Sequence, residues 1–83
     1  MTVSIDVTLY ARARDLAGTD KTTLTLQNSA TVGDLRNALA ETYPNLRPYI
    51  PNLLIALGTD YAPDATPIGH HRQAACFPPV SGG

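Results

Sequence analysis

The sequence predicts a two-layer α+β domain: a mixed sheet of four to five strands packed on one main helix. Three observations predict it. The chain has 83 residues, which is enough for one modest core and no second domain. Two early segments alternate between apolar and polar residues, and a well-marked helix start follows them. A single helix covering one face of a sheet is the simplest way to close a core of this size.

The first third of the chain predicts two strands. Residues 3–11 alternate with period two and are rich in β-branched residues, which is typical of a strand with one buried face. Residues 12–18 are compatible with one helical turn that ends at Gly18, because glycine accepts the left-handed conformation. Residues 21–27 alternate again. The short link between the two segments favours an antiparallel pair.

The middle of the chain predicts the main helix. Thr31 and Asp34 have the spacing of a capping box, in which each side chain satisfies a backbone amide of the first turn. Pro44 ends the helix, since it biases the preceding residue away from helical geometry. Apolar residues at helical spacing mark the face turned to the core: Val32, Leu35, Ala38, Leu39 and Tyr43.

The last third predicts short strands. Residues 53–57 form a short apolar run, 58–60 a turn, 61–62 a brief return strand, 63–69 a loop and 73–77 the last strand. This order favours a β-grasp, ubiquitin-like arrangement. A ferredoxin-like fold is less favoured, because only one long helix is visible.

Composition excludes several classes of function. Six Lys and Arg stand against seven Asp and Glu, so the positive charge of a duplex-binding protein is missing. No stretch approaches the roughly 18 apolar residues of a membrane span, and the start lacks the pattern of a signal peptide. We therefore expect a cytoplasmic protein. Only 16% of residues are charged, against about 25% in an average domain, which leaves uncharged surface for a partner.

The chemistry is expected at the C-terminal end. Pro78 and Pro79 cannot donate to a sheet ladder and favour a stiff, extended stalk. We expect residues 1–79 to form the single domain and 80–83 a flexible tail, thin enough to enter a channel because glycine has no Cβ. The tip would be the free carboxylate of Gly83. Ionised carboxylates are poor electrophiles, so a partner enzyme would have to activate it with ATP as an acyl-adenylate.

The residues of this tail resemble a known signature. Phe-Pro-Pro-Val-Ser-Gly-Gly over residues 77–83 is similar to the C-terminus of the MoaD/ThiS ubiquitin-like family, and most closely to its MoaD branch, the small, sulfur-carrying subunits of molybdopterin synthase. Residues 14–18, Arg-Asp-Leu-Ala-Gly, resemble the family segment after the first strand. Thr31 and Val32, with Leu35, resemble its helix start. The resemblance covers nearly the whole chain.

The resemblance implies a β-grasp fold and a sulfur carrier. An E1-like adenylating enzyme (MoeB type) would activate Gly83 with ATP, and a sulfur donor would convert it to a thiocarboxylate. The tail would then enter the large synthase subunit, MoaE, and donate sulfur to cyclic pyranopterin monophosphate, within a heterotetramer. The carrier would bind no cofactor or metal and would not be catalytic alone. Its other implied site residues are Ser81 and Gly82 for threading, and Phe77, Pro78, Pro79, Val80 and Arg14 for partner binding.

Before its last strand the chain departs from that family pattern. An acidic turn is replaced by basic or neutral residues from His70 onward, and Ala74 and Cys76 are smaller than the residues expected there. We expect Tyr49 or Tyr61 to fill the lost volume. Cys76 itself is expected to be a buried, inert thiol.

Other functions stay open at this point. Related carriers serve thiamine or cysteine synthesis, although they usually lack the Phe-Pro-Pro-Val stalk. A ubiquitin-like protein modifier would use the same tip, and a plain binding module would not need it. Adjacent His70 and His71 are expected in an exposed turn, because neighbours in an extended segment point to opposite faces and rarely share a metal ion.

Overall fold

A computed structural model describes residues 1–79 and confirms the α+β, β-grasp prediction. The sheet has five strands, and two helices are present in place of the one main helix expected. Two 3₁₀ turns, η1 and η2, occupy the proline-rich connection. In chain order the elements are β1 (Thr2–Leu9), α1 (Ala11–Ala17), β2 (Lys21–Gln27), α2 (Val32–Thr42), η1 (Pro44–Leu46), η2 (Ile50–Asn52), β3 (Leu54–Leu57), β4 (Asp60–Tyr61) and β5 (Gln73–Phe77).

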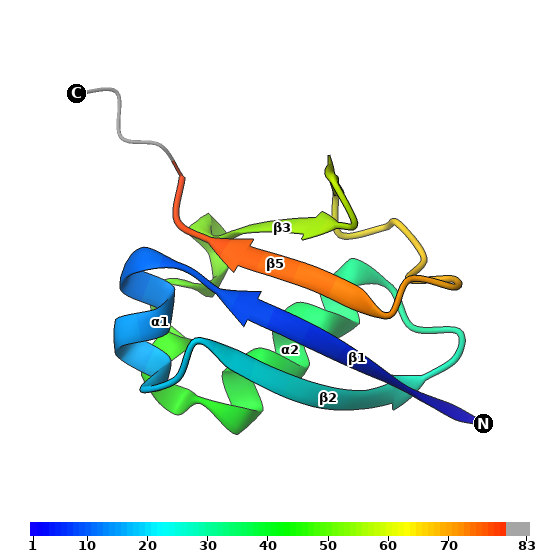
Figure 1. Cartoon of the computed structure of the whole chain (residues 1–83), viewed down its shortest axis with the longest axis horizontal. Helices are drawn as coiled ribbons and strands as arrows, with labels where there is room; N and C mark the ends of the chain where they lie inside the picture. The colour runs from blue at the N-terminus through cyan, green and yellow to red at the C-terminus, as the bar shows by residue number, and fades with distance from the viewer. Residues whose placement is uncertain (80–83) are drawn as a thin grey trace.

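The sheet is mixed, with strand order β2-β1-β5-β3-β4. The central pair, β1 and β5, is parallel, and the other three pairs are antiparallel. Because β1 and β5 run the same way, β5 ends at the side of the molecule opposite the N-terminus (Figure 1). The topology therefore carries the chain out of the sheet far from where it entered.

Helix α1 is longer than the single turn that was predicted. It has seven residues and ends at Gly18, whose φ of 79° is the left-handed conformation expected there. Arg12 and Arg14 lie two apart on this helix, so their side chains point in different directions. The guanidinium of Arg12 lies 5.5 Å from the centre of the Tyr49 ring, whereas Arg14 lies 3.7 Å from a carboxylate oxygen of Asp15.

Helix α2 starts with the predicted capping box. The Thr31 hydroxyl accepts from the Asp34 amide, and the Asp34 carboxylate accepts from the Thr31 amide at 2.9 Å. The loop before β5 supplies carbonyl acceptors for the other amides of the first turn of α2. The amide of Val32 donates to the carbonyl of Thr66 at 2.9 Å, so the loop and the helix start hold each other in place.

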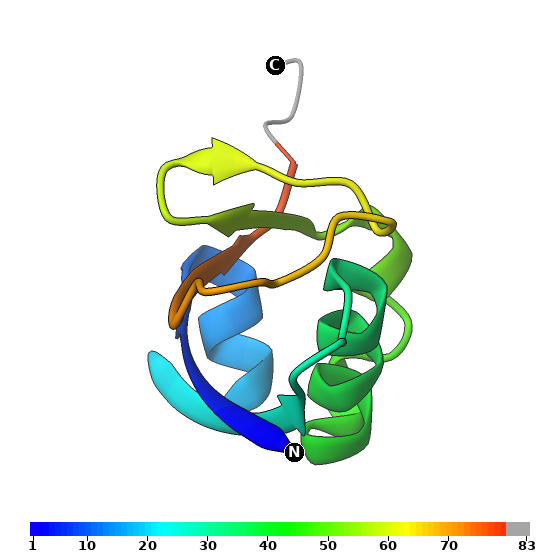
Figure 2. The ribbon, with the colours of Figure 1, turned by 90° about the vertical axis from the view of Figure 1, so that its right-hand side faces the viewer.

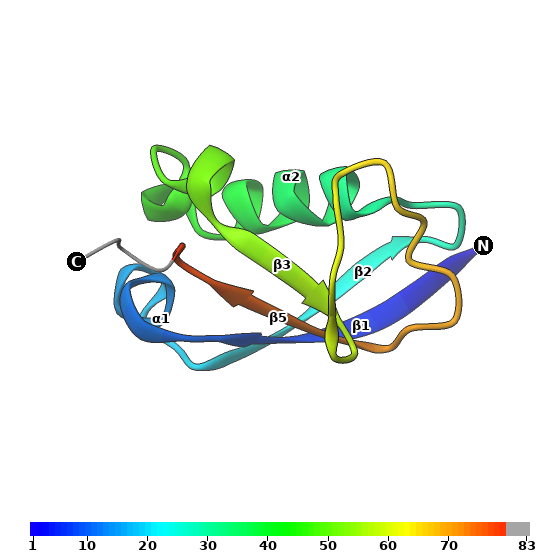
Figure 3. The same cartoon turned by 90° about the horizontal axis from the view of Figure 1, so that it is seen from above.

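The core lies between the sheet and α2, and the sheet curls around the helices (Figures 2 and 3). Alternation along β5 turns Ala74 and Cys76 toward this core, and both are buried. No polar side chain of residues 1–79 is fully buried. Among the same residues, no helix is long and apolar enough to cross a membrane. The largest fully buried side chains are Ile5, Leu9, Leu35, Leu39, Leu46, Ile55 and Ile68.

Candidate functional site

The end of β5 is held by backbone pairing on both sides. The amide of Tyr10 donates to the carbonyl of Cys76 at 3.0 Å, and Phe77 is in register with Leu54 of β3. The chain then continues into Pro78, which cannot donate to a ladder. The sheet thus delivers the segment that follows Phe77 at one defined place, beside α1 (Figure 1).

Three aromatic side chains meet at this place, and we call them the aromatic cluster: Tyr10, Tyr61 and Phe77. The Phe77 ring lies 6.3 Å from the Tyr10 ring, edge to face, and 5.4 Å from the Tyr61 ring. Tyr10 follows β1, Tyr61 belongs to β4 and Phe77 ends β5. The tyrosines are 50% and 65% exposed, so the cluster is a surface feature.

An exposed aromatic cluster of this kind suits protein binding. Aromatic side chains bury a large apolar area on contact, and a phenol adds a hydrogen-bonding group at the rim. Phe77 was predicted as a partner-binding residue, and the structure adds Tyr10 and Tyr61, which the sequence reasoning missed. Tyr10 had a usable signal, since it stands where Asp6 and Thr8 place the polar face of β1. For Tyr61 the sequence held no such signal.

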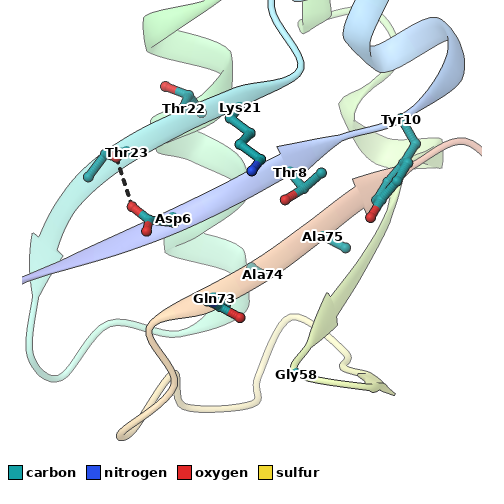
Figure 4. A pocket seen from close by; sticks show the side chains of 10 residues that line it. All are labelled: Asp6, Thr8, Tyr10, Lys21, Thr22, Thr23, Gly58, Gln73, Ala74 and Ala75. Atoms are coloured by element: carbon teal, nitrogen blue, oxygen red, sulfur yellow. Dashed lines mark hydrogen bonds between the residues drawn. The ribbon is translucent and has the colours of Figure 1, made fainter.

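A polar hollow of about 470 Å³ runs from Tyr10 across the outer face of the sheet. Figure 4 shows Lys21 reaching from β2 across β1, and the Thr23 hydroxyl donating to Asp6 at 2.8 Å. The hollow is broad, and within residues 1–79 its one hydroxyl–carboxylate pair, Thr23 with Asp6, is exposed to solvent. The surface is therefore suited to contact rather than to catalysis.

The remaining predicted site residues divide into two groups. Pro78 is half-buried and Pro79 exposed at the end of the described chain, and Arg14 is exposed on α1 at the same end of the molecule. The predictions for Val80, Ser81, Gly82 and Gly83 lie outside the described residues. So does the proposed tail of residues 80–83.

Cys76 is completely buried, as expected for an inert thiol. Loss of solvation on burial raises the pKa of its thiol from 9.0 to about 11, and the nearby charge of Arg36 offsets this in part. Almost no thiolate is present near neutral pH, so Cys76 is not a nucleophile in the folded chain.

The expectation that a tyrosine fills the space beside Cys76 is wrong. Tyr61 contacts Phe77, which points to the opposite face of β5. Tyr49 contacts Arg12 instead. The space at this point of the core is occupied by aliphatic side chains such as Ile55, which is in register with Cys76.

The histidines lie in the loop before β5, and both are exposed. A Cβ placed on Gly58 would lie 3.7 Å from the His71 ring. In the described part of the chain, no three His, Cys, Asp or Glu residues are arranged to hold a metal ion.

Comparisons with known proteins agree on one family. The model of the ThiS family matches residues 7–83. The molybdopterin synthase sulfur carrier subunit of Arabidopsis thaliana is 33% identical over 81 residues, which cover 98% of this chain and 84% of that protein. The protein of the same name from Mycobacterium tuberculosis is 28% identical and covers 98% of this chain and 99% of its own length.

The solved structures add a relative with a different name. The crystal structure of SAMP1 from Haloferax volcanii, a small archaeal modifier protein, superimposes with a TM-score of 0.87. It is 26% identical in sequence, and the match covers 98% of this chain and 100% of that one.

Proposed function

The chain belongs to the ThiS family, and on that premise we propose that it is a sulfur carrier of molybdenum cofactor biosynthesis. In this proposal it is the small subunit of molybdopterin synthase, and Gly83 holds the transferred sulfur as a thiocarboxylate. Support comes from two relatives that carry this name and match 98% of the chain. The chain supplies the carried group, and its partners supply the catalytic acids and bases.

The observation that carries the proposal is the aromatic cluster at the end of β5. It stands where the chain enters the Phe-Pro-Pro-Val-Ser-Gly-Gly segment. A partner that receives the tail needs a surface beside it to grip, and Phe77 with Tyr10 and Tyr61 offers one. The same surface can serve the activating enzyme and the acceptor in turn, since both must hold the same tail.

The chemistry at Gly83 takes two steps on partner enzymes. A carboxylate oxygen attacks the α-phosphate of ATP, which releases pyrophosphate and leaves an acyl-adenylate. A sulfur nucleophile from the donor then attacks the acyl carbon, and AMP leaves with the oxygen. Gly82 and Ser81 would keep the tail narrow enough to enter both active sites.

The proposed function also implies particular partner proteins. We propose an E1-like adenylating enzyme (MoeB type) and a sulfur donor for these two steps, and the large synthase subunit, MoaE, for the sulfur transfer that follows. There the thiocarboxylate would give its sulfur to cyclic pyranopterin monophosphate in a heterotetramer. Pro78, Pro79 and Val80 would lie along the path into each partner, with Arg14 beside it on α1.

The test is the intact mass of the chain after incubation with ATP, the adenylating enzyme and a sulfur donor. We expect the mass of the full chain to rise by the difference between sulfur and oxygen. This gain should be absent after removal of Gly83. The adenylating enzyme is first shown to be active on a known carrier. No gain under those conditions would refute the proposal.

A second candidate is a protein modifier joined to lysines through Gly83. The similarity to SAMP1 over 98% of the chain favours it. The two functions share the activated tail and differ in the acceptor. Incubation of the activated chain with the large subunit and pterin precursor, and separately with a cell extract, distinguishes them. Sulfur transfer supports the carrier, and isopeptide conjugates that depend on Gly83 support the modifier. Sulfur transfer to a thiazole or cysteine precursor alone would indicate the related carriers.

A further inference from the structure

The open edge of the sheet is strand β2. It has seven residues and pairs with β1 on one side only, whereas β4 at the other edge has two residues. A long edge strand presents backbone N–H and C=O groups that another chain can pair with.

The register of β1 and β2 sorts the backbone groups. The amide of Asn28 donates to the carbonyl of Met1 at 3.0 Å, which marks one hydrogen-bonded position of this antiparallel ladder. Such positions alternate along the strand. Every second residue of β2, counted back from Asn28, is therefore hydrogen-bonded to β1. Thr23 and Thr25 alternate with these residues, so they point their N–H and C=O groups away from β1, toward the open edge.

Both ends of this edge are closed by the chain itself. The Thr19 hydroxyl donates to the carbonyl of Lys21 at 2.9 Å and accepts from its amide at 3.4 Å. At the other end the carbonyl of Gln27 accepts from the amide of Ala30 at 2.9 Å. Within residues 1–79, the pairing positions left open are thus Thr23, Thr25 and the Gln27 amide. The open part of the edge is thus a strand-pairing site of defined length.

A groove of about 450 Å³ lies beside this edge, between the end of β2 and helix α2. Leu26 and Ala38 provide apolar surface in it, and Asp34 and Glu41 provide carboxylates. Among the described residues, no Lys, Arg or His lines the groove. At the opposite end of β2 the Tyr43 hydroxyl donates to Thr22 at 2.8 Å and joins the helix to the strand.

We propose that β2 binds an extended segment of a partner protein as an added strand, with an apolar side chain in the groove and Lys or Arg on either side of it. Strand addition gains affinity from main-chain hydrogen bonds and specificity from alternate side chains. Within residues 1–79 neither Asp34 nor Glu41 forms an ion pair, so their carboxylates select the basic residues.

Thr2 and Gln27 line the groove, near the N-terminus, whereas the aromatic cluster includes Phe77 at the end of β5. These two ends of the sheet lie on opposite sides of the molecule (Figure 1). A partner on β2 therefore leaves the tail end of the molecule accessible. The inference does not depend on the proposed function, since it concerns a different surface.

The test uses a blocked peptide, Ac-Lys-Thr-Val-Thr-Lys-NH2, titrated into the full ¹⁵N-labelled chain and followed by NMR. We expect shifts of the amides of β2 and of the α2 residues that line the groove. We also expect slower hydrogen exchange at the amides of Thr23 and Thr25. The aromatic cluster is not expected to respond.

Matched probes separate strand addition from simple charge attraction. The peptide N-methylated on the alternate amides that face β2 is expected to bind roughly tenfold more weakly, as the loss of two hydrogen bonds implies, and the other N-methylated form is not. Glu41→Lys is expected to weaken binding roughly two- to fivefold, and Asp15→Lys, the same charge change on α1, is not. Both substitutions are at exposed helix positions.

Three outcomes would overturn the inference. One is the absence of shifts at millimolar peptide. Another is equal binding of both N-methylated forms, which would indicate side-chain attraction only. The third is protection of the Thr23 and Thr25 amides in the chain alone, lost on dilution, which would show that a second copy occupies the edge.

Discussion

The two faces of the sheet around β5 carry opposite kinds of side chain. The inner face holds Ala74 and Cys76, which are small and buried, and the outer face holds Phe77 beside two exposed tyrosines. None of the five aromatic residues of the chain is fully buried. The fully buried core is aliphatic, with the partly buried Tyr43 packed against it, and the aromatic cluster lies at the surface. Stability and recognition should therefore respond to different substitutions on one and the same strand pair.

The largest effect is expected on the inner face. Ile55 lies opposite Cys76 in the register of β3 and β5 and is 2% exposed. Ile55→Ala should lower the free energy of unfolding by about 2–5 kcal/mol, because it removes buried apolar area and leaves a cavity. A chain of this size has about 4–12 kcal/mol in total. Urea unfolding measures the change.

Leu54→Ala is the matched control on the neighbouring position. Leu54 points to the other face and is half-buried, so its loss should cost clearly less. Equal losses of unfolding free energy in Ile55→Ala and Leu54→Ala would contradict the distinction between the two faces.

The next effect is expected on the outer face, and on recognition. Phe77→Ala should lower kcat/KM of the adenylating enzyme for this chain about tenfold, because truncation of a central aromatic contact commonly costs more than 1 kcal/mol. Its effect on unfolding should be smaller than that of Ile55→Ala. Tyr49→Ala is the control, since Tyr49 is partly exposed and lies outside the aromatic cluster. A loss of activity that only tracks the loss of stability would contradict the separation.

Local sequence signals account for most of the inner face. The strands β2 and β5 were predicted with their observed bounds, and the capping box of Thr31 and Asp34 was predicted correctly, because period-two alternation and capping are properties of neighbouring residues. The full length of α1 was not predicted, since its short run has no long apolar stripe.

The outer face could not be predicted in the same way. The aromatic cluster joins the residue that follows β1 to residues of β4 and β5, and only the long-range register of the sheet brings them together. The sequence could assign Phe77 to partner binding through its motif, but it could not place Tyr61 beside it. The open edge of β2 likewise follows from strand order, which no local pattern contains.

The buried thiol of Cys76 on the inner face should make the stability of the fold depend on pH. Burial raises the pKa of Cys76 from 9.0 to about 11, so the folded chain keeps its proton where the unfolded chain releases it. This contribution is fully present below pH 9 and is lost as the pH rises toward 11, with a slope of at most about 1.4 kcal/mol per pH unit.

Cys76→Ala isolates that contribution. Between pH 8 and 10.5 the unfolding free energy of the wild type should fall by about 1–2 kcal/mol more than that of Cys76→Ala. Other groups titrate in both proteins and cancel in the difference. Parallel pH curves would show that the thiol is not held neutral by the core.

The smallest effect is expected far from the tail, at the start of α2. Thr31→Ala removes the side chain that accepts from the Asp34 amide and should cost about 1 kcal/mol of unfolding free energy. Thr31→Ser keeps the hydroxyl and should cost much less. Both variants should accept sulfur at the wild-type rate at a temperature where they are folded, because the cap does not contact the aromatic cluster. A slower rate in Thr31→Ala alone, with folding intact, would show that the helix start and the tail end are coupled through the core, and that the two faces of the sheet do not act separately.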